Sequence, residues 1–395
     1  MFTSSTVTRA QRTPSIDWQG ATTASAIDAL SSPADVSLVT VFAPTIIADR
    51  TFNFHPCSFQ SSDGRVHLAH TTHDTDEEGP GTYVRYHYSD DNGATWTEAT
   101  TPLLPQLVPS ASAGGTLKHT PLPVAFVEIN TIVYCVLDVV YRNPDPSLGL
   151  VVLAVPVVAG VPGIAKIVHR PDWTAQSGYT QYTYDAILGG EVIREINFPH
   201  GVSWGMGFDD VQDFRIVIPE GVLVEHSKVK VAGGWMRFSR IIEAVTADDV
   251  QWLWASFSTD GVEFGTPWKT NAPNATSRTC VKKMSDRYVL ITNANNTSRR
   301  GGIAGYSLDG LTWTATDTEK ILDAGDNIWS PAPASSDTAG GWAGPWQPYW
   351  YGSAKGGQTS YFHITELANG KYLTTYGERG KEVIRVATWT PKSMS

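Results

Sequence analysis

Short runs of β-branched and aromatic residues recur along the chain, each bounded by glycine, proline, asparagine or aspartate. Runs of this kind predict β-strands, and the bounding residues predict tight turns. No long heptad or amphipathic helical stretch interrupts them. The pattern therefore predicts an all-β protein. The clearest predicted strands span residues 65–70, 82–88, 132–137, 150–155, 215–218, 288–293, 302–307, 361–365, 371–376 and 383–389.

One octapeptide, residues 89–96, reads Ser-Asp-Asp-Asn-Gly-Ala-Thr-Trp and has the form S-x-D-x-G-x-T-W. Its residues suit a hairpin turn: Asp91 accepts hydrogen bonds from turn amides, Gly93 allows a positive φ, and the final tryptophan packs back between strands. Weaker copies begin at Ser258 and Ser307, 49 residues apart. That spacing is a suitable length for one blade of a β-propeller.

The repeated turn predicts an all-β β-propeller of four-stranded antiparallel blades. At about 50 residues per blade, the chain allows six or seven blades, and seven is favoured. Residues 1–40, rich in serine, threonine and alanine, are expected to form an N-terminal arm, or a strand that closes the ring or contacts a partner. Residues 41–395 are expected to form the single propeller domain.

Composition agrees with an all-β protein and argues against nucleic-acid binding. The chain has 35 Gly, 24 Pro and only 17% charged residues, as expected for many short strands and turns. With 29 Lys and Arg against 39 Asp and Glu, it lacks the basic balance of a nucleic-acid-binding protein. Cys57, Cys135 and Cys280 lie far apart in sequence and are expected to be buried thiols.

The N-terminus has no apolar core of a signal peptide, and no apolar run is long enough to span a membrane. We therefore expect no membrane partner and no nucleic-acid partner. The expected location is extracellular or virion-associated without a recognisable signal peptide, as for a phage enzyme released by lysis. The sequence is compatible with a homo-oligomer.

The motif and two further regions carry a resemblance to a known family. The octapeptide is similar to the Asp box, or BNR repeat, of sialidase-like β-propellers. The segments 277–313 and 360–386 resemble two blades of bacterial sialidase-like proteins, and the likeness covers about residues 45–390. This superfamily contains sialidases, arabinan-acting hydrolases and ulvan-type polysaccharide lyases. The resemblance therefore implies one fold but does not select one of these activities.

A sialidase holds the substrate carboxylate with three arginines and uses an aspartic acid and a tyrosine nucleophile. The region before the first Asp box lacks the Arg-Ile-Pro motif that sialidases carry and reads Asp-Arg-Thr-Phe-Asn-Phe-His-Pro over residues 49–56. The candidates that the resemblance offers for these roles are Arg50, Arg300 and Arg385 for the arginines, Asp74 for the acid, and Tyr361 or Tyr376 for the nucleophile.

A uronate lyase needs a base to remove the proton beside a carboxylate, an acid for the leaving oxygen and a group that neutralises the carboxylate. The resemblance to ulvan-type lyases assigns these roles to His119 as base, Tyr184 as acid or alternate base, and Arg194 as carboxylate clamp. His55 and His200, each beside a proline, are second-line candidates that line the channel. The alternative to these catalytic roles is a structural one, with His119 as a residue at a strand end and Tyr184 as an aromatic residue of the blade core.

An aromatic loop at residues 334–357 offers flat apolar rings, of which Trp346 and Trp350 are candidates for stacking on sugars. The alternative is that this loop packs on its own blade or on a neighbouring subunit.

A histidine cluster raises the question of a metal. His67, His70 and His73 lie close to Asp74 and Asp76. Alternate side chains of a strand point to opposite faces, so the three histidines cannot all point one way. We expect no cofactor, and a structural or carboxylate-neutralising metal is the alternative.

Three functions follow from the sequence. The favoured one is a polysaccharide lyase that cleaves an acidic, uronate-containing exopolysaccharide or capsule by β-elimination. The second is an exo-acting glycoside hydrolase of sialidase type, and the third is a non-catalytic glycan-binding propeller. The expected partner is accordingly an acidic polysaccharide or a sialoglycan.

Overall fold

The computed structural model describes residues 15–20, 22, 26, 29–42, 52–73, 82–104, 118–142, 150–168, 192–193, 216–242, 244–261, 263–274, 277–293, 301–322, 359–378 and 383–394. The elements formed by these residues are β-strands and two short 3-10 turns, η4 (Asp249–Gln251) and η5 (Ala315–Asp317). Within the same ranges, no helix is long and apolar enough to cross a membrane.

Five larger sheets are formed by the described residues, and we name each after its innermost long strand. The β3 sheet contains β3 (Phe52–Gln60), β4 (Val66–His73), β5 (Tyr83–Ser89) and β6 (Thr97–Glu98). The β7 sheet contains β7 (Lys118–Ile129), β8 (Ile132–Arg142), β9 (Leu150–Val158), β10 (Val161–Pro162), β11 (Lys166–Val168) and β12 (Val192–Ile193).

The other three sheets complete this set. The β14 sheet contains β13 (Ile216–Ile218), β14 (Gly221–Val231), β15 (Gly234–Ile242), β16 (Trp252–Ser258) and β17 (Trp268–Pro273). The β18 sheet contains β18 (Cys280–Lys283), β19 (Tyr288–Thr292), β20 (Gly302–Ser307) and β22 (Thr318–Leu322). The β23 sheet contains β23 (Thr359–Glu366), β24 (Tyr372–Glu378), β25 (Val383–Trp389) and β2 (Ser37–Phe42).

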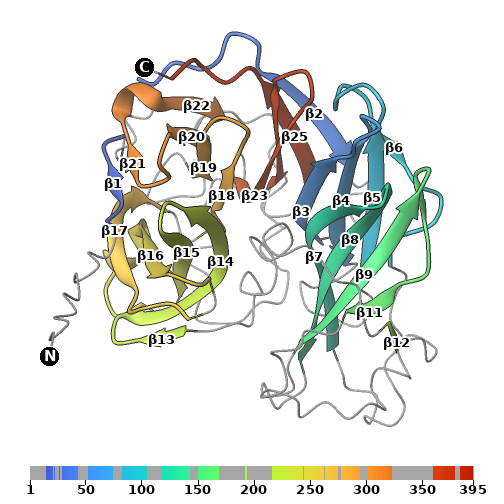
Figure 1. Cartoon of the computed structure of the whole chain (residues 1–395), viewed down its shortest axis with the longest axis horizontal. Helices are drawn as coiled ribbons and strands as arrows, with labels where there is room; N and C mark the ends of the chain where they lie inside the picture. Colours follow the sequence, from blue (N-terminus) through green and yellow to red (C-terminus); the bar gives the residue numbers. More distant parts are fainter. Residues whose placement is uncertain are drawn as a thin grey trace, which may run out of the picture.

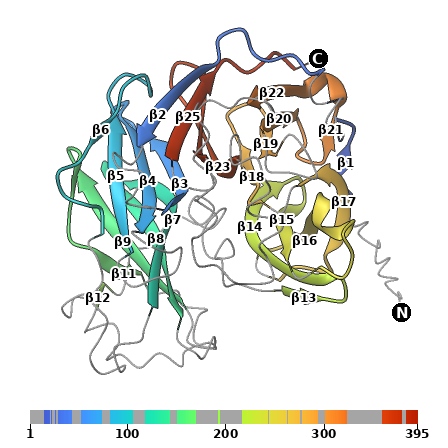
Figure 2. The ribbon, with the colours of Figure 1, turned by 180° about the vertical axis from the view of Figure 1, so that it is seen from behind.

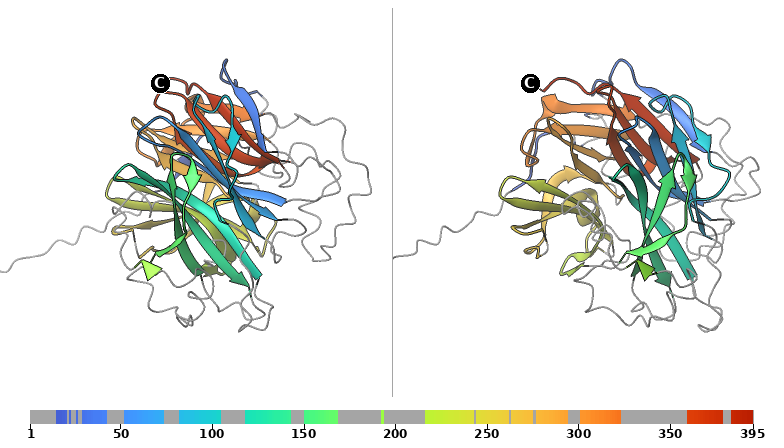
Figure 3. Two further views of the ribbon diagram at one scale, coloured as in Figure 1. Left: turned by 90° about the vertical axis from the view of Figure 1, so that its right-hand side faces the viewer. Right: turned by 45° about the vertical axis from the view of Figure 1, so that its right-hand side comes forward.

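These sheets follow one another around a common axis, as the blades of a propeller do (Figures 1 and 2). The inner strands contact each other in the order β14, β18, β23, β3 and β7. Figure 3 shows the same succession from two further sides. The predicted all-β class is confirmed, and each strand predicted from the sequence pattern overlaps an observed strand. The six or seven blades stay a prediction, because residues 169–191 and 323–358 are outside the described ranges.

The domain boundary expected at residue 40 stays a prediction, and the structure shows where the described residues around it lie. Residue 40 lies inside β2, which pairs with β25 as the outer strand of the β23 sheet. Val39, Val41 and Phe42 pack against the apolar cluster between the β23 and β3 sheets. Further upstream, β1 (Asp17–Trp18) pairs with β21 (Thr312–Trp313). The described part of residues 1–40 is therefore joined to the propeller rather than separate from it, because its apolar side chains complete two sheet faces.

Apolar clusters fill the spaces between neighbouring sheets. Trp18 and Trp313 are almost fully buried, with ring centroids 6.3 Å apart, in a cluster that the β14 and β18 sheets share. Cys57, Cys135 and Cys280 are buried and free, as predicted. The core is thus divided into layers between blades, which explains how so long a chain forms one structure without one large core.

The three motif turns have one common hydrogen-bond pattern. In each turn the serine hydroxyl donates to the aspartate, the glycine amide donates to the serine oxygen, and a later amide donates to the aspartate, at distances of 2.7–3.0 Å. The three glycines have φ of 88°, 79° and 77°. The serine, aspartate and glycine residues are Ser89, Asp91 and Gly93; Ser258, Asp260 and Gly261; and Ser307, Asp309 and Gly310.

Side chains connect the inner strand of one sheet to the backbone of the next. The Ser227 hydroxyl oxygen accepts from the amide of Val281 at 3.0 Å, across β14 and β18. The Lys282 ammonium donates to the carbonyl of Ile364 at 2.7 Å, across β18 and β23. The inner edge of a blade has no further strand to pair with, so these bonds satisfy backbone groups that would otherwise be buried without partners.

Two glutamates repeat this connection at the hairpin end of the blades. The carboxylate of Glu128, at the end of β7, accepts from the amide and hydroxyl of Ser62, with the amide at 2.7 Å. Glu366, at the end of β23, binds Ser285 in the same way, with the amide at 2.8 Å. Each pair joins the first hairpin of one blade to the inner strand of its neighbour.

We expect Glu128→Ala and Glu366→Ala each to lower the free energy of unfolding by about 1–2 kcal/mol, because each removes charge-assisted bonds between blades. Urea denaturation measures this quantity. Glu220→Ala, at an exposed glutamate, is the control and is expected to change it by less than about 0.5 kcal/mol. Equal effects at all three positions would contradict a role in joining blades.

The turn aspartates predict a loss of stability in acid. Burial raises the pKa of Asp309, but bonds from the Thr312 and Leu311 amides and from Ser307 outweigh it, so the pKa lies below 3.8. A carboxyl with a lowered pKa stabilises the fold above its ordinary pKa, and this contribution is lost as the pH falls through the folded value. Asp309→Asn should therefore cost about 1 kcal/mol at neutral pH and progressively less below pH 3.8. A cost independent of pH would contradict the assignment.

Candidate functional site

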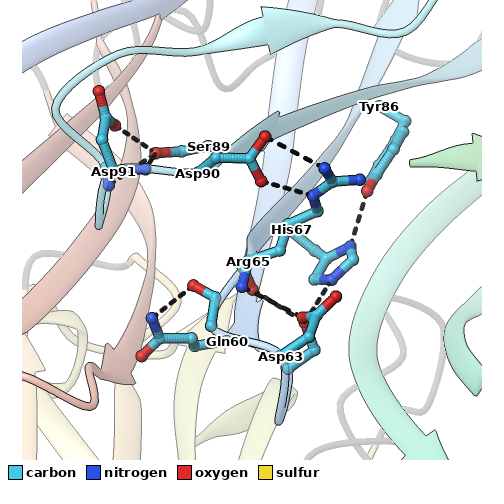
Figure 4. Close-up of polar contacts among 11 residues, drawn as sticks. Gln60, Asp63, Arg65, His67, Tyr86, Ser89, Asp90 and Asp91 are labelled. Carbon is cyan, nitrogen blue, oxygen red and sulfur yellow. Dashed lines mark hydrogen bonds and ion pairs between the residues drawn. The ribbon is translucent and has the colours of Figure 1, made fainter. Parts of the chain in front are cut away.

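One pocket of about 490 Å³ lies at the hairpin end of the β3 and β23 sheets, lined by Gln60, Asp63, Gly64, Arg65, Asp90, Asn92, Ala368 and Asn369. Figure 4 shows its polar groups bonded to each other. Arg65 forms a bidentate pair with Asp90, at 2.7 and 3.1 Å. The Gln60 amide donates to Asn92 at 3.0 Å and accepts from the Ala368 amide at 2.6 Å. These contacts hold adjacent turns together. Because the polar side chains of the pocket bond to each other, we assign the pocket a structural role.

The opposite ends of the inner strands carry a different kind of feature. β3 is bulged between Phe54 and Cys57, and β23 between Ser360 and His363. β-Bulges redirect side chains and recur beside active sites. Within these two bulges, His55 has φ 50° and Tyr361 has φ 60°.

Positive φ is unfavourable for residues with bulky side chains, and it is costlier still at His55, which precedes Pro56. The His55 and Tyr361 rings lie against each other, with centroids 4.1 Å apart and planes at 36°. Both side chains are buried, with 1% and 2% of their surfaces exposed. Strained backbone of this kind clusters at functional sites, so this contact marks the candidate site.

Arg278 joins the pair from the β18 side. Its Nη1 atom donates to His55 Nδ1 at 3.3 Å, and the side chain is only 5% exposed. Because Nδ1 of His55 accepts this bond, a neutral His55 ring carries its proton on Nε2. Three sheets thus bring a guanidinium, an imidazole and a phenol into one contact group.

Arg385 contributes a second buried guanidinium from β25. It is 6% exposed and lies opposite Tyr376 of β24. Alternation along β25 places Arg385 on the same face as Ala387 and Trp389, which pack between the β18 and β23 sheets. Tyr376 is fully buried in the same cluster and contacts Phe362, with ring centroids 6.2 Å apart.

The structure therefore brings together His55 and Tyr361 among the residues predicted from sequence and places Arg385 in the same sheet as Tyr361, two strands away. The backbone of His119 lies in β7, opposite Tyr141, and its side chain is outside the described part. The remaining candidates also lie outside the described residues: Arg50, Asp74, Tyr184, Arg194, His200, Arg300, Trp346 and Trp350.

The predicted separation of the histidine cluster is confirmed. His67 contacts Tyr86 and the Ser61 hydroxyl, whereas His70 lies on the other face of β4 and contacts His87, with Nε2 atoms 3.0 Å apart. No group of three or more potential metal ligands occurs within the ranges that the structure describes. The side chains of His73, Asp74 and Asp76 lie outside those ranges.

Comparison with known proteins shows a likeness in fold. No protein-family model and no curated protein matches it. Among solved structures, a sialidase is similar with a TM-score of 0.61 and 14% identity, over 95% of this chain and 35% of that chain. The fold is sialidase-like.

Two further structures support this conclusion. The NanB sialidase from Streptococcus pneumoniae has a TM-score of 0.53 and 11% identity, over 89% of this chain and 70% of that chain. A protein of unknown function from Dyadobacter fermentans has a TM-score of 0.54 and 13% identity, over 91% of this chain and all of that chain. The chain spans about a third of the length of the first sialidase, and identities this low show the fold alone.

Sequence reasoning assigned no role to one residue of the site, Arg278, or to two other buried histidines, His363 and His87. Arg278 was part of the family resemblance but had no assigned role, and its contact with His55 spans 223 positions. His363 lies between the apolar residues Phe362 and Ile364 of a predicted strand, so the signal available was a histidine at an inner-strand position. His87 gave no signal, because its partner His70 is visible only when β4 and β5 are paired.

Buried neutral histidines make stability sensitive to acid. Burial lowers the pKa of His87 to about 3 and, with His87 nearby, that of His70 well below 6.5. A folded pKa below the unfolded one means that the unfolded chain binds more protons, so stability is complete above pH 6.5 and falls as the pH drops toward 3.

We expect His87→Gln to reduce the dependence of unfolding free energy on pH between 6.5 and 4, by up to about 1.4 kcal/mol per pH unit. Urea denaturation at a series of pH values measures the slope. An unchanged slope would show that His87 is not held neutral in the fold.

Proposed function

We propose that this sialidase-like propeller is a glycan-active enzyme that acts on an acidic glycan, and that His55, Tyr361 and Arg278 belong to its site. The observation that carries the proposal is the contact between His55 and Tyr361, two strained residues on adjacent inner strands. Such strain persists only where the surrounding structure enforces it, and proteins place it where function needs a fixed geometry.

The charges of the group favour an acidic sugar. A guanidinium binds a carboxylate with two parallel hydrogen bonds, and it stays charged when buried. Arg278 contacts His55 directly, and Arg385 lies in the sheet that carries Tyr361. A uronate or a sialic acid carries the carboxylate that these residues would recognise.

The chemistry that we favour is β-elimination on a uronate. A base removes the proton at C5, the electron pair forms the double bond between C4 and C5, and the C4–O bond breaks with protonation of the leaving oxygen. This reaction needs a group that neutralises the carboxylate and groups that carry protons. Arg278 is suited to the first role, and the Tyr361 hydroxyl to the second.

The roles predicted for His119, Tyr184 and Arg194 remain part of this proposal, since two of these residues and the side chain of the third lie outside the described ranges. In a neutral His55, Nε2 is a hydrogen-bond donor, so we assign His55 to orienting Tyr361 and the substrate rather than to proton abstraction.

Sialidase-type hydrolysis is the second candidate, because the solved structures of similar fold include sialidases. In that reaction Tyr361 would attack the anomeric carbon, and the arginines would hold the sialic acid carboxylate. Both reactions depend on the same hydroxyl group, so they differ in product rather than in the residue to be tested.

Ultraviolet absorbance with a panel of uronate-containing polysaccharides, run beside a fluorogenic sialoside, tests the proposal. We expect the unsaturated uronate signal to rise with the native protein. Tyr361→Phe should reduce the rate by about 10²–10⁴-fold, because it removes the hydroxyl and keeps the ring that packs on His55.

Tyr88→Phe is the matched control. Tyr88 contacts Arg65 near the end of β5, at the hairpin end of the blade, whereas the bulges in β3 and β23 lie at the opposite end. It should retain the native rate. Sialoside turnover without an absorbance rise would establish the hydrolase instead of the lyase. Native activity in Tyr361→Phe would refute the assigned site, and no turnover of either substrate class would leave glycan binding as the function.

A further inference from the structure

His363 is a buried histidine that the proposed reaction does not use. It lies in β23, two positions beyond Tyr361, and is 3% exposed. Its Nδ1 atom accepts a hydrogen bond from the Ser58 amide of β3 at 3.2 Å. Among the described residues, its Nε2 atom is buried and has no hydrogen-bond partner.

The Ser58 contact fixes the tautomer. A backbone amide can only donate, so Nδ1 of His363 must be unprotonated, and the proton of the neutral ring is on Nε2. The buried Nε2 atom is therefore a hydrogen-bond donor without an acceptor. A buried polar group left without a partner costs about 1–3 kcal/mol, so such groups usually have one.

Two positively charged side chains lie near His363. The Lys282 ammonium binds the carbonyl of Ile364, the residue after His363, at 2.7 Å. Arg278 is held by His55, on the same inner strand as Ser58. Burial first, and then the charges of Lys282 and Arg278, lower the pKa of His363 well below 6.5. Two cations are thus bound to residues adjacent to His363 or to its neighbour β3, and both affect its ring.

We propose that the propeller axis binds a small inorganic anion of chloride size, with His363 Nε2 as a hydrogen-bond donor and with Lys282 and Arg278 supplying positive charge. An anion there accepts the Nε2–H bond and is attracted by both positive charges.

This anion would stabilise the junction of three blades, since His363, Ser58 and Lys282 belong to β23, β3 and β18. The inference shares Arg278 with the proposed glycan site, but its test measures stability and ion density at His363 rather than turnover. Failure of one proposal therefore does not decide the other.

Thermal unfolding in sodium chloride, compared with sodium gluconate at the same ionic strength, tests the site. An anion that binds only the folded state raises stability with the logarithm of its concentration. We expect the melting temperature to rise by roughly 1–3 °C for each tenfold increase in chloride above its dissociation constant, and not with gluconate. Equal melting temperatures in both salts would overturn the proposal.

Two variants separate the donor from the rest of the ring. His363→Gln keeps an N–H donor near the Nε2 position, whereas His363→Asn keeps an acceptor near Nδ1 for the Ser58 amide and lacks that donor. The chloride effect should persist at least in part in His363→Gln and disappear in His363→Asn. A chloride effect of native size in His363→Asn would overturn the assignment of the donor.

Crystals of the native protein soaked in sodium bromide give a test that needs no variant. An anomalous bromide peak within hydrogen-bonding distance of His363 Nε2 supports the site. A water molecule in that place, with bromide found only at the surface as an adventitious ion, refutes it.

Discussion

The structure depends on how the inner edge of each blade is satisfied. A strand at the edge of a sheet presents unpaired amides and carbonyls, and at the propeller axis these groups are removed from water. Ser227, Lys282 and His363 each bond to the backbone of the next inner strand, across three successive junctions. The blades are thereby joined at the axis by polar side chains, and at greater radius by the apolar layers between sheets. Polar side chains near the axis are therefore needed for the fold, whether or not they also bind a ligand.

This requirement explains where a site can form. The inner strands already carry histidine, lysine and arginine side chains. A local change in the direction of the backbone is enough to turn such side chains toward a ligand. The bulges at His55 and Tyr361 supply that change, and they lie at the end of the strands opposite the rigid motif turns. The hairpin end is held by the motif turns and the two serine–glutamate contacts, so the opposite end can accept strain without loss of the fold.

The all-β class and the sialidase-like fold could be predicted from the sequence because they depend on local signals. Alternating strands, and turn residues such as Asp91 and Gly93, act within a few positions, and their pattern repeats. The candidate site depends instead on contacts between blades. Arg278 and His55 are 223 positions apart, and Ser58 and His363 are 305 apart, so no local pattern predicts either contact. His55 and Tyr361 were found as single candidates from their neighbours in sequence, but their contact and their strained backbone required the structure.

The central claim is that an acidic glycan binds at the bulged end of the inner strands. The most direct measurement is a crystal structure of the Tyr361→Phe variant with a uronate-containing oligosaccharide, because slowed turnover would preserve the substrate. The account predicts density for the sugar beside His55, with its carboxylate facing Arg278. Density only at the hairpin end, against Arg65 and Asp90, would contradict it and move the binding site to the other end of the blades.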